Sequence, residues 1–462
     1  MFALLDMIFM NYIEMSKLFC DDSLTLKRRT QFMSHILITF LGKVIKDGGR
    51  YEEVTYRFDN GQTYTKSFFG LALLEHLQAS DSKPDKLVIL GTTGSMWDAF
   101  FEVDEELMEK HEDEYYALNE LIEDYGDKPP TEEQSEELNP YLSLLENELT
   151  QYLNIPCEFH LIPYGRKQEE QTEILKIMAD CVTDEDKVTL DITHGLRHLP
   201  MLVVLSAMYL KVVKAVEVAG IYYGAKDMQH LETEDVAPAL DLSGLLQIAE
   251  WVKALNSFEK DRDYGVFSEL LETDGLTKQQ TKPLKDAAFF ERIFNVSQAA
   301  KKLTAFSQNT PEELPGMGSL FSDTLSKHIE WPTKGNLYDH QRELAYSFLD
   351  KKDYQRAAIF AVEAFITKLM HDDNYTSEDI REYNQRDAAK NLFLDEKLGD
   401  SRKISDFRLL KNMRNAMAHV NEPRDDVKRI MEDEVRDNNN SLVRRLEIEL
   451  RRLMNRLFPQ KK

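Results

Sequence analysis

The sequence predicts a doubly wound α/β domain in the first half of the chain, followed by a helical second half. Four short apolar runs in the first 240 residues each end in a turn signal and precede a helical pattern, as buried parallel strands do. Strand signals disappear after Asp241, and the remaining pattern has the periodicity of amphipathic helices. A chain of 462 residues, 42% of them hydrophobic, is long enough for two or three domains.

The expected strands alternate with helices in the manner of a Rossmann-like parallel sheet. The strands are residues 36–41, 86–90, 187–192 and 216–223, with a fifth candidate at 158–162. Amphipathic helices lie between them, including residues 70–77 and 171–180. This alternation predicts a sheet domain over residues 33–240. Within it, the acidic segment 101–150 indicates a helical insertion with a solvated face.

The second half divides into a helical connector, residues 241–337, and an all-α domain, residues 338–462. Two breaks rich in Pro and Gly, 311–318 and 331–335, mark the end of the connector. Beyond them the pattern is entirely helical and ends in an apolar stripe over residues 442–457.

Charge is distributed unevenly along the chain. The net charge of −25 argues against a protein that wraps nucleic acid non-specifically, because affinity for phosphates comes mainly from Lys and Arg. Residues 401–462 instead contain 16 Lys and Arg against 10 Asp and Glu, a local net charge of +6. If the protein binds RNA, we expect the C-terminal part to do so.

Cysteine usage and hydropathy favour a cytoplasmic protein. Cys20, Cys157 and Cys181 lack CxxC spacing, so the sequence predicts neither a disulfide framework nor a metal site. No apolar run reaches the ~18 residues that a membrane span needs. The apolar start of the chain lacks a basic region and contains Asp6, so it makes a poor signal peptide. We expect residues 1–32 to be a peripheral N-terminal extension, or upstream sequence read from an early start codon.

A Gly-rich loop follows the second expected strand. It reads Gly91-Thr92-Thr93-Gly94-Ser95, and its amides and hydroxyls suit phosphate oxygens or a nucleotide at a helix N-terminus. The loop lacks the spacing of a P-loop and of a dinucleotide-binding fold. The alternative is a tight strand–helix turn in which Ser95 is the N-cap.

A second polar loop follows the strand that ends at Asp191. Thr193, His194 and Arg197 in this loop are suited to purine edges or phosphates. The alternative is that Asp191 and Thr193 cap the next helix while His194 packs. Both loops lie at carboxyl ends of strands in one sheet, which is where open α/β sheets bind ligands.

The C-terminal hexapeptide Arg414-Asn415-Ala416-Met417-Ala418-His419 carries groups that suffice for metal-free RNA cleavage. An imidazole moves protons near neutral pH, and a guanidinium holds the charge that builds on a phosphoryl group. Asn415 and His419 are four residues apart and share a face of a helix. Arg414 and His419 lie about 140° apart on an ideal helix, so one copy closes a site only if the helix ends or bends near His419. Otherwise two copies must meet across a dimer axis. The alternative is an Arg paired with a surface carboxylate and a His near a helix C-terminus.

The segment Asp191-Ile192-Thr193-His194-Gly195 resembles the signature of the DxTHG family of CRISPR-associated proteins. The runs ILITFLGK, LGTTGSMWD and GIYYGA also resemble that family's sheet. The family joins a CRISPR-associated Rossmann-fold (CARF) sensor to a helical HEPN (higher eukaryote and prokaryote nucleotide-binding) ribonuclease domain. The HEPN motif is an Arg, a polar residue, a few variable residues and a His, which Arg414, Asn415 and His419 match. The resemblance covers nearly all of residues 33–462.

The resemblance implies an accessory ribonuclease of type III CRISPR defence. A cyclic oligoadenylate, by family resemblance the four-membered ring, would bind a CARF dimer, and the HEPN dimer would then cut single-stranded RNA without a metal or other catalytic cofactor. Arg414 and His419 would be the catalytic pair and Asn415 the orienting residue, with the RNA 2′-hydroxyl attacking its own 3′-phosphate to leave a 2′,3′-cyclic phosphate. The candidate ring-binding residues are Gly42, Lys43, Gly91, Thr92, Thr93, Gly94, Ser95, Thr193, His194, Gly195 and Arg197.

The partners expected from this resemblance are RNA, the cyclic nucleotide and at least one further copy of the chain, with no membrane and no stable membership of a CRISPR complex. Two other functions remain open. The first alternative is a non-enzymatic cyclic-nucleotide sensor whose helical half binds a partner. The second is a HEPN toxin nuclease that is independent of nucleotide.

Overall fold

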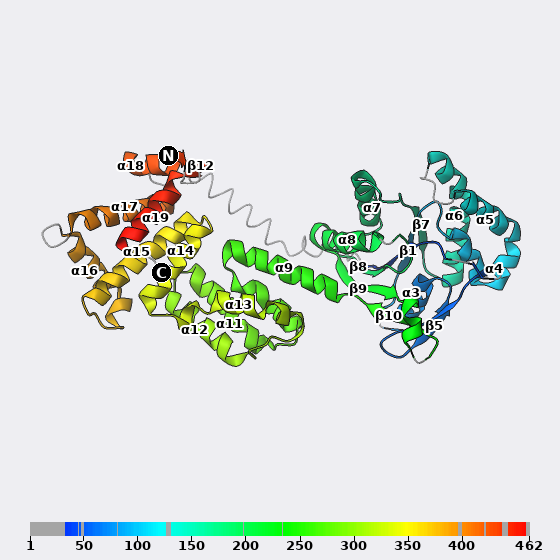
Figure 1. The fold of residues 1–462 in the computed structure, drawn as a ribbon, viewed down its shortest axis with the longest axis horizontal. Coiled ribbons are helices and arrows are strands. Elements are labelled where there is room, and N and C mark those ends of the chain that lie inside the picture. Colours follow the sequence, from blue (N-terminus) through cyan, green and yellow to red (C-terminus); the bar gives the residue numbers. More distant parts are fainter. Residues whose placement is uncertain are drawn as a thin grey trace, which may run out of the picture. The chain divides into compact units, whose positions relative to one another are not determined.

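The computed structural model (Figure 1) describes residues 33–44, 46–47, 50–80, 82–125, 131–196, 198–232, 234–395, 400–419, 422–436 and 442–458. The expected N-terminal extension, residues 1–32, and the candidate ligand residue Arg197 lie outside these ranges. The chain folds as two compact units, one up to Leu246 and one from Gln247 onward. Among the described helices, none is both long and apolar enough to cross a membrane.

An eight-stranded sheet forms the centre of the first unit, in the order β5-β4-β10-β9-β8-β1-β6-β7. Its five parallel strands are β1 (His35–Leu41), β6 (Lys86–Gly91), β7 (Cys157–Leu161), β8 (Lys187–Asp191) and β9 (Glu217–Gly224). These are the five strands that the apolar runs predict. The chain adds β6 and then β7 on one side of β1, and β8 and then β9 on the other. The direction of winding therefore reverses at β1, which is the usual position of a ligand site in such sheets.

The remaining strands were not predicted from the sequence. They are β4 (Val54–Arg57), β5 (Thr63–Lys66) and β10 (Ala237–Asp241), together with a small hairpin of β2 (Lys46–Asp47) and β3 (Arg50–Tyr51). β10 runs antiparallel to β9, so the sheet is mixed at this side. These strands are two to five residues long and alternate with polar residues, so they give a much weaker signal than a buried apolar run.

Helices cover both faces of the sheet, as Figure 1 shows. One face carries α3 (Phe69–Gln78) and the acidic segment, which forms η1 (Trp97–Val103), α4 (Glu105–Lys110), α5 (Glu112–Tyr125) and α6 (Glu132–Leu153). The other face carries α7 (Gln168–Asp180) and α8 (Leu199–Val213), and η2 (Lys226–Leu231) follows β9. Successive side chains of β1 enter opposite cores, Leu37 with α3 and Ile36 with α7 and α8, because neighbouring residues of a strand point to opposite faces.

The second unit is almost entirely helical and encloses one hydrophobic core. Its helices are α9 (Gly244–Asp261, within which the two units divide), η3 (Tyr264–Phe267), α10 (Ser268–Thr273), α11 (Lys278–Arg292), α12 (Val296–Asn309), η4 (Gly316–Phe321), α13 (Ser322–Ile329), η5 (Trp331–Thr333), α14 (Leu337–Asp350), α15 (Tyr354–Asp372), η6 (Asp379–Arg381), α16 (Tyr383–Leu394), α17 (Ser401–Ala418), α18 (Asp425–Glu432) and α19 (Arg445–Leu457). The expectation of a purely helical domain is wrong in one place, because β11 (Glu434–Arg436) and β12 (Leu442–Arg444) pair as a hairpin. Strands of three residues are too short to show a period in the sequence.

A buried polar cluster joins the first helices of the second unit to α14. The Arg262 guanidinium contacts Glu291 at 3.1 Å, the hydroxyl of Tyr264 at 2.7 Å and Ser347 at 2.7 Å. The Trp331 indole donates to the same Tyr264 oxygen. Arg262 and Glu291 are both nearly inaccessible to water, so each charge depends on the other for compensation.

We expect Glu291→Ala to destabilise the second unit by roughly 3–5 kcal/mol, because it leaves the Arg262 charge buried and unpaired. Guanidinium denaturation followed by tryptophan fluorescence measures this loss, since Trp251 and Trp331 both lie in this unit. The control is Glu269→Ala, which removes an exposed partner of Lys285 and should change stability by less than about 0.5 kcal/mol. Equal effects of the two substitutions would contradict the importance of the buried pair.

Candidate functional site

Three loops meet at the carboxyl edge of the sheet in the first unit. The backbone N–H of Met96, after β6, donates to the Gly42 oxygen at 2.8 Å, and the Ser95 hydroxyl donates to the Leu41 oxygen at 2.8 Å. Gly42 also packs against the loop after β8, because a Cβ atom at this position would lie 2.4 Å from the Gly195 nitrogen. The structure therefore brings together the loops that the sequence singles out, and Gly42 is the residue that both of the others touch.

Asp191 fixes the loop after β8 from inside the sheet. Its carboxylate accepts hydrogen bonds from the backbone N–H of Thr193 at 2.8 Å and from the hydroxyl of Thr39 on β1. Asp191 is fully buried, and this burial raises the pKa of its carboxyl to about 6, although the bonds from the two threonines act in the opposite direction. The carboxylate thus holds β8 and β1 in register at the point where the loops begin.

The side chains of Thr193 and His194 extend this bonding to two further elements. The Thr193 hydroxyl accepts from the backbone N–H of Gly224, at the end of β9, at 2.8 Å. The His194 Nε2 accepts a hydrogen bond of 3.1 Å from the backbone N–H of Phe69, and Phe69 is the first residue of α3. Burial, with the positive charge of Lys226, lowers the pKa of His194 to about 4, so the ring is neutral at pH 7.

The helix that follows this loop begins without the expected caps. α8 starts at Leu199 after His198, which makes no side-chain capping bond. The alternative interpretation, in which Asp191 and Thr193 cap this helix, is therefore wrong, because both side chains are engaged with β1, β9 and their own loop. The packing part of that interpretation agrees with the structure, since the His194 ring lies 5.2 Å from that of Phe68.

The Gly-rich loop also differs from its expected form. A 3₁₀ helix, η1, follows it in place of an α-helix, and Ser95 does not cap it. The reason is the Trp97 side chain, whose indole donates to the Thr92 oxygen at 2.8 Å and covers Gly91 so closely that a Cβ there would lie 2.5 Å from the ring. The Ser95 hydroxyl instead bonds the Thr92 N–H at 2.9 Å.

Several of the predicted ligand residues keep polar groups that the protein does not use. The Thr93 hydroxyl is buried and has no hydrogen-bond partner among the described residues. Lys43 and Gly195 are exposed, and Gly195 has a φ of +124°, a conformation that favours glycine. Lys43 and Gly195 lie next to Gly42 at the loop junction, whereas Thr93 lines a cavity together with residues of α6, β7 and α7. They could contact an anionic or purine ligand, whereas Thr193, His194 and Ser95 mainly position the loops.

Sequence reasoning missed two of the positioning residues, Thr39 and Phe69. Thr39 left a signal, because it is the one hydroxyl-bearing residue within the apolar run of β1. Phe69 takes part through its backbone N–H, and no side-chain pattern can indicate that role.

In the second unit, α17 carries the Arg–His motif and ends at it. The helix runs to Ala418, and His419 has an extended backbone (φ −124°, ψ 146°) while its N–H still donates to the Asn415 oxygen. His419 is thus the C-cap residue of α17 and remains bonded to Asn415, four residues before it. The helix ends at His419, which is the condition under which one copy of the chain closes a site.

Arg414 lies where the core meets the surface. Phe407, Leu410 and Met413 of α17 are fully buried, whereas Arg414 is half-buried. Its Nε is shielded from solvent and lacks a hydrogen-bond partner in the described part of the chain, and His419 is exposed. Neither side chain takes part in an ion pair with another described residue, so the alternative of an Arg neutralised by a surface carboxylate is not favoured.

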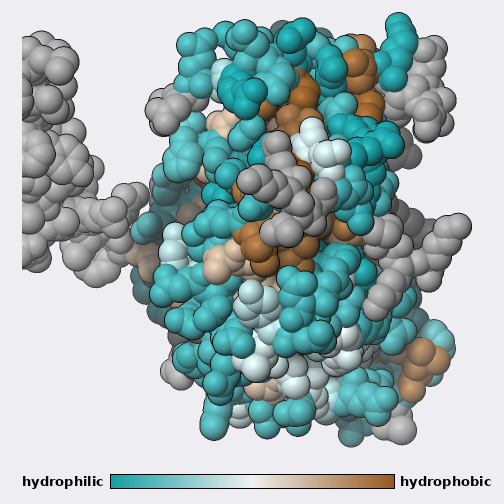
Figure 2. Space-filling view, turned by 90° about the vertical axis from the view of Figure 1, so that its left-hand side faces the viewer, coloured by the Kyte–Doolittle hydropathy of each residue, from teal (hydrophilic) through white to brown (hydrophobic). Residues whose placement is uncertain are grey.

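The surface around this helix is polar. Figure 2 views the second unit from the end that carries α16, α17 and α18, and this face is largely hydrophilic with small hydrophobic areas between. With the local charge of +6 over residues 401–462, such a face suits a polar, anionic substrate better than an apolar one.

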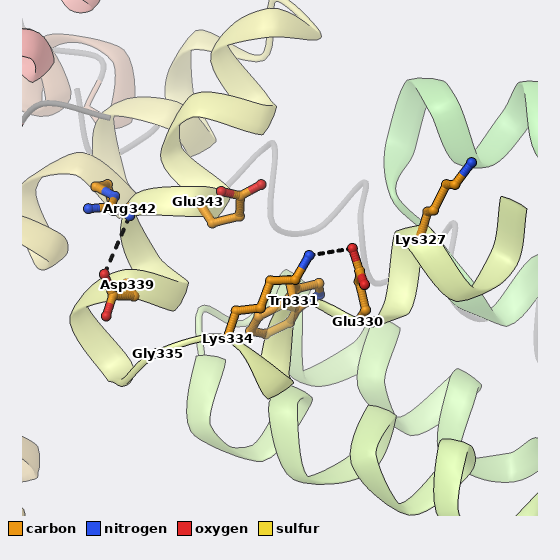
Figure 3. Close-up of a pocket in the computed structure, with 8 residues that line it drawn as sticks. All are labelled: Lys327, Glu330, Trp331, Lys334, Gly335, Asp339, Arg342 and Glu343. Carbon is orange, nitrogen blue, oxygen red and sulfur yellow. Dashed lines mark hydrogen bonds and ion pairs between the residues drawn. The ribbon is translucent and has the colours of Figure 1, made fainter. Parts of the chain in front are cut away.

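A separate pocket of about 270 Å³ lies beside the start of α14 (Figure 3). Its residues are Lys327, Glu330, Trp331, Lys334, Gly335, Asp339, Arg342 and Glu343. Lys334 pairs with Glu330, and Arg342 pairs with Asp339 at 3.4 Å. Because most of its charges are already compensated, this pocket is a weaker candidate than the loop junction or the end of α17.

Comparisons with known proteins agree with the sheet and its loops. Residues 36–227 match the family described as CRISPR system endoribonuclease Csx1, CARF domain. CRISPR-associated protein MJ1674 of Methanocaldococcus jannaschii is 24% identical over 391 residues, which cover 80% of this chain and 59% of that relative. The match thus spans less than two thirds of the relative's length. The sheet with its strand-end loops is therefore similar to a CARF domain.

We expect Asp191 and His194 to give the first unit opposing pH dependences of stability. Asp191 binds its proton more tightly when folded (pKa about 6, against ~3.9 in an unfolded chain), so it lowers stability as the pH rises from about 4 to 6. His194 binds its proton more weakly when folded (pKa about 4, against ~6.5), so it lowers stability as the pH falls from about 6.5 to 4.

Removing one of the two groups should leave the pH dependence of stability that the other group causes. Relative to the unsubstituted protein, Asp191→Asn should lose stability as the pH falls below about 6, and His194→Gln should gain stability as the pH falls below about 6.5, each by up to about 1.4 kcal/mol per pH unit. Calorimetric melts between pH 4 and 7 measure the difference. Parallel pH profiles for all three proteins would show that these two pKa values are not shifted by folding.

Proposed function

We propose that this chain is a ribonuclease of type III CRISPR defence, switched on by a cyclic oligoadenylate that binds the CARF domain. The helical second unit would act as a HEPN domain and cut single-stranded RNA in the cytoplasm. The observation that carries the nuclease part is the end of α17 at His419, which leaves an exposed imidazole five residues after a guanidinium that pairs with no described carboxylate. The similarity of residues 36–227 to a CARF domain supports the sensor part.

The loop junction around Gly42 is the proposed binding site for the ring. Backbone amides and hydroxyls at strand ends bind phosphate oxygens and purine edges. Because Gly42 lacks a side chain, the loops after β1 and β8 pack closely together, and the exposed backbone of Gly195 is available to a ligand. Lys43, exposed beside them, supplies a positive charge for a phosphate.

A second copy of the chain is the proposed partner of α8. Met201, Leu205, Tyr209 and Val212 are spaced as one helical face, and they are exposed by 73, 58, 44 and 68%. Exposed apolar stripes of this kind mark interaction surfaces. α8 begins a few residues after Gly195, so a two-fold partner on this face would bring two copies of the ligand loops near one axis, as a symmetric ring requires.

The chemistry proposed for the second unit is an internal transfer. The RNA 2′-hydroxyl loses its proton as its oxygen bonds to the adjacent phosphorus, and the bond to the 5′-oxygen breaks as that oxygen gains a proton. The products are a 2′,3′-cyclic phosphate and a 5′-hydroxyl. His419 is suited to the proton transfers, and Arg414 to the charge on the phosphoryl oxygens.

Cleavage of a fluorescent single-stranded RNA should require a cyclic oligoadenylate, and we expect the four-membered ring to be the most effective. A titration with rings of three, four and six adenylates and with linear tetra-adenylate tests this. Gly42→Ala should abolish activation, because its Cβ would clash with the Gly195 backbone.

The outcomes separate the competing functions. Ring binding without cleavage would identify a non-enzymatic sensor, and equal cleavage without any nucleotide would identify a toxin-like nuclease. Activation by linear tetra-adenylate as effective as by a ring would refute the proposed sensor.

His419→Ala should reduce cleavage by about 10²–10⁴-fold without changing ring binding, since one general acid–base group contributes that much. Arg414→Lys should also abolish cleavage, because lysine keeps the positive charge but lacks the planar guanidinium that binds two phosphate oxygens. The matched controls are His328→Ala, whose ring pairs with Glu259, and Arg408→Lys on the same helix. EDTA should not reduce cleavage. Wild-type rates for His419→Ala, or loss of activity in EDTA, would refute the catalytic assignment.

Leu205→Asp on the exposed face of α8 should convert a dimer into monomers and abolish ring-activated cleavage. Light scattering measures the mass, and Lys211→Ala on the same helix, which lowers the net charge by the same one unit, is the control. Mixing Arg414→Ala with His419→Ala protomers should restore part of the activity if the site draws on both chains. A monomer with full activity would contradict the dimer proposal.

A further inference from the structure

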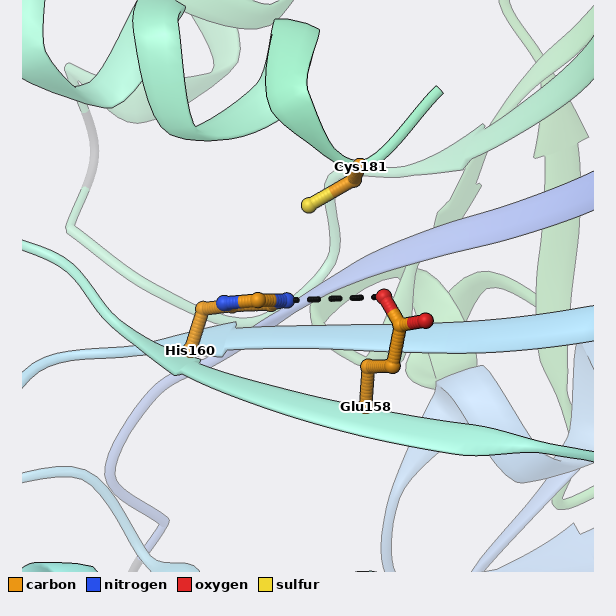
Figure 4. A group of neighbouring side chains, drawn as sticks. All are labelled: Glu158, His160 and Cys181. Atoms are coloured by element: carbon orange, nitrogen blue, oxygen red, sulfur yellow. Dashed lines mark ion pairs between the residues drawn. The ribbon is translucent and has the colours of Figure 1, made fainter. Parts of the chain in front are cut away.

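Three metal-ligating side chains converge at the free edge of the sheet in the first unit (Figure 4). Glu158 and His160 are two residues apart on β7, so they point to the same face of the strand. Cys181 is the C-cap residue of α7, which covers that face. One ligand atom from each residue lies within 4.8 Å of the other two.

One nitrogen of the His160 imidazole makes no hydrogen bond to any described residue. Its Nε2 is shielded from solvent and has no hydrogen-bond partner among the described residues, and its nearest charged neighbour is a Glu158 oxygen at 3.6 Å. A polar atom that is buried and unsatisfied calls for an explanation, such as an ion. Figure 4 shows the Cys181 sulfur pointing toward the same ring.

We propose that Glu158, His160 and Cys181 form a binding site for a zinc ion that ties the edge strand β7 to the end of α7. Carboxylate, imidazole and thiolate together are a ligand set that zinc accepts. A tetrahedral zinc ion with bonds of about 2.0–2.3 Å holds its ligand atoms roughly 3.3–3.8 Å apart, so movements of about 1 Å close the group.

The fourth position of the ion is open to water, because the side chains of Glu158 and His160 are 40 and 39% exposed. On binding, the Cys181 thiol releases its proton to solvent and gives up its hydrogen bond to the Ile177 oxygen. The site therefore has ligands from two elements and an entry path from the surface.

Lys86 of β6 competes with the ion. Its ammonium lies 3.1 Å from both oxygens of Glu158 and donates to the Cys181 backbone oxygen at 2.9 Å. Zinc must share the Glu158 carboxylate with this charge, and the two cations repel each other. Removal of Lys86 is therefore a specific test, since it should strengthen metal binding although it deletes two native contacts.

The experiment uses the full-length protein, stripped with chelator and titrated with Co²⁺ and with Zn²⁺. Co²⁺ should give the near-ultraviolet absorption of a cobalt–thiolate bond with one ion per chain, and Zn²⁺ should displace it and raise the melting temperature. Cys181→Ser and His160→Ala should each weaken binding by at least about tenfold and remove the thermal shift. Cys157→Ser is the matched control, because Cys157 is also buried but lies on β7 and points to the opposite face of the sheet.

Lys86→Met should tighten the affinity by about tenfold or more, an estimate from the Coulomb repulsion that it removes. Circular dichroism confirms that each variant is folded. The proposal is overturned if the unsubstituted protein gives no thiolate band, if Cys181→Ser and His160→Ala bind like it, or if Cys157→Ser loses binding equally. Ring-activated RNA cleavage by the stripped protein should persist, which separates this structural site from the proposed catalysis.

Discussion

The buried carboxylate of Asp191 is the interaction on which the ligand end of the first unit depends. It lies at the carboxyl end of β8, where it accepts from the Thr193 backbone and from the Thr39 hydroxyl of β1. From there, Thr193 bonds the end of β9 and His194 bonds the start of α3. Four elements are thus held at fixed positions around one fully buried charge. Burial of that charge is unfavourable, which the raised pKa reflects, and the bonds that it accepts offset the cost.

This bonding changes how the loop motif is understood. A threonine and a histidine after a strand suggest direct ligand contacts, yet both side chains point inward and organise the loops. The groups that would face a ligand there are instead the exposed backbone of Gly195 and the exposed side chain of Lys43. A polar network that is satisfied internally keeps the loops rigid, and a rigid site loses less entropy when a ligand binds.

The second unit follows a different principle, in which a helix end sets the position of the reactive groups. The apolar side chains of α17 fix the helix against the core, and Arg414 is held at the boundary by the same packing. His419 follows after the helix has ended, so its ring depends little on helical geometry. Arg414 contributes a charge that no described carboxylate neutralises. A half-exposed guanidinium without such a partner is available to a substrate phosphate, which is the physical basis of the proposed nuclease activity.

Sequence patterns alone predict the five parallel strands, the loops that follow them and the division into a sheet unit and a helical unit. These features depend on local patterns, namely apolar runs, turn residues and helical periodicity, that each segment carries independently of the rest. The short strands β2 to β5 and β10 and the β11–β12 hairpin were missed because their local signals are weak.

Which residues come into contact depends on how the elements pack in three dimensions. The bond between Thr39 and Asp191 joins positions 152 residues apart, and the close approach of Gly42 to Gly195 is similarly distant in sequence. The grouping of Glu158 and His160 with Cys181 was likewise invisible, since the cysteine spacing alone predicts no metal site. The end of α17 at His419 also escaped the sequence pattern, which continues without a glycine or proline at that point. Contacts of this kind follow from the packing of whole elements, and no single segment encodes them.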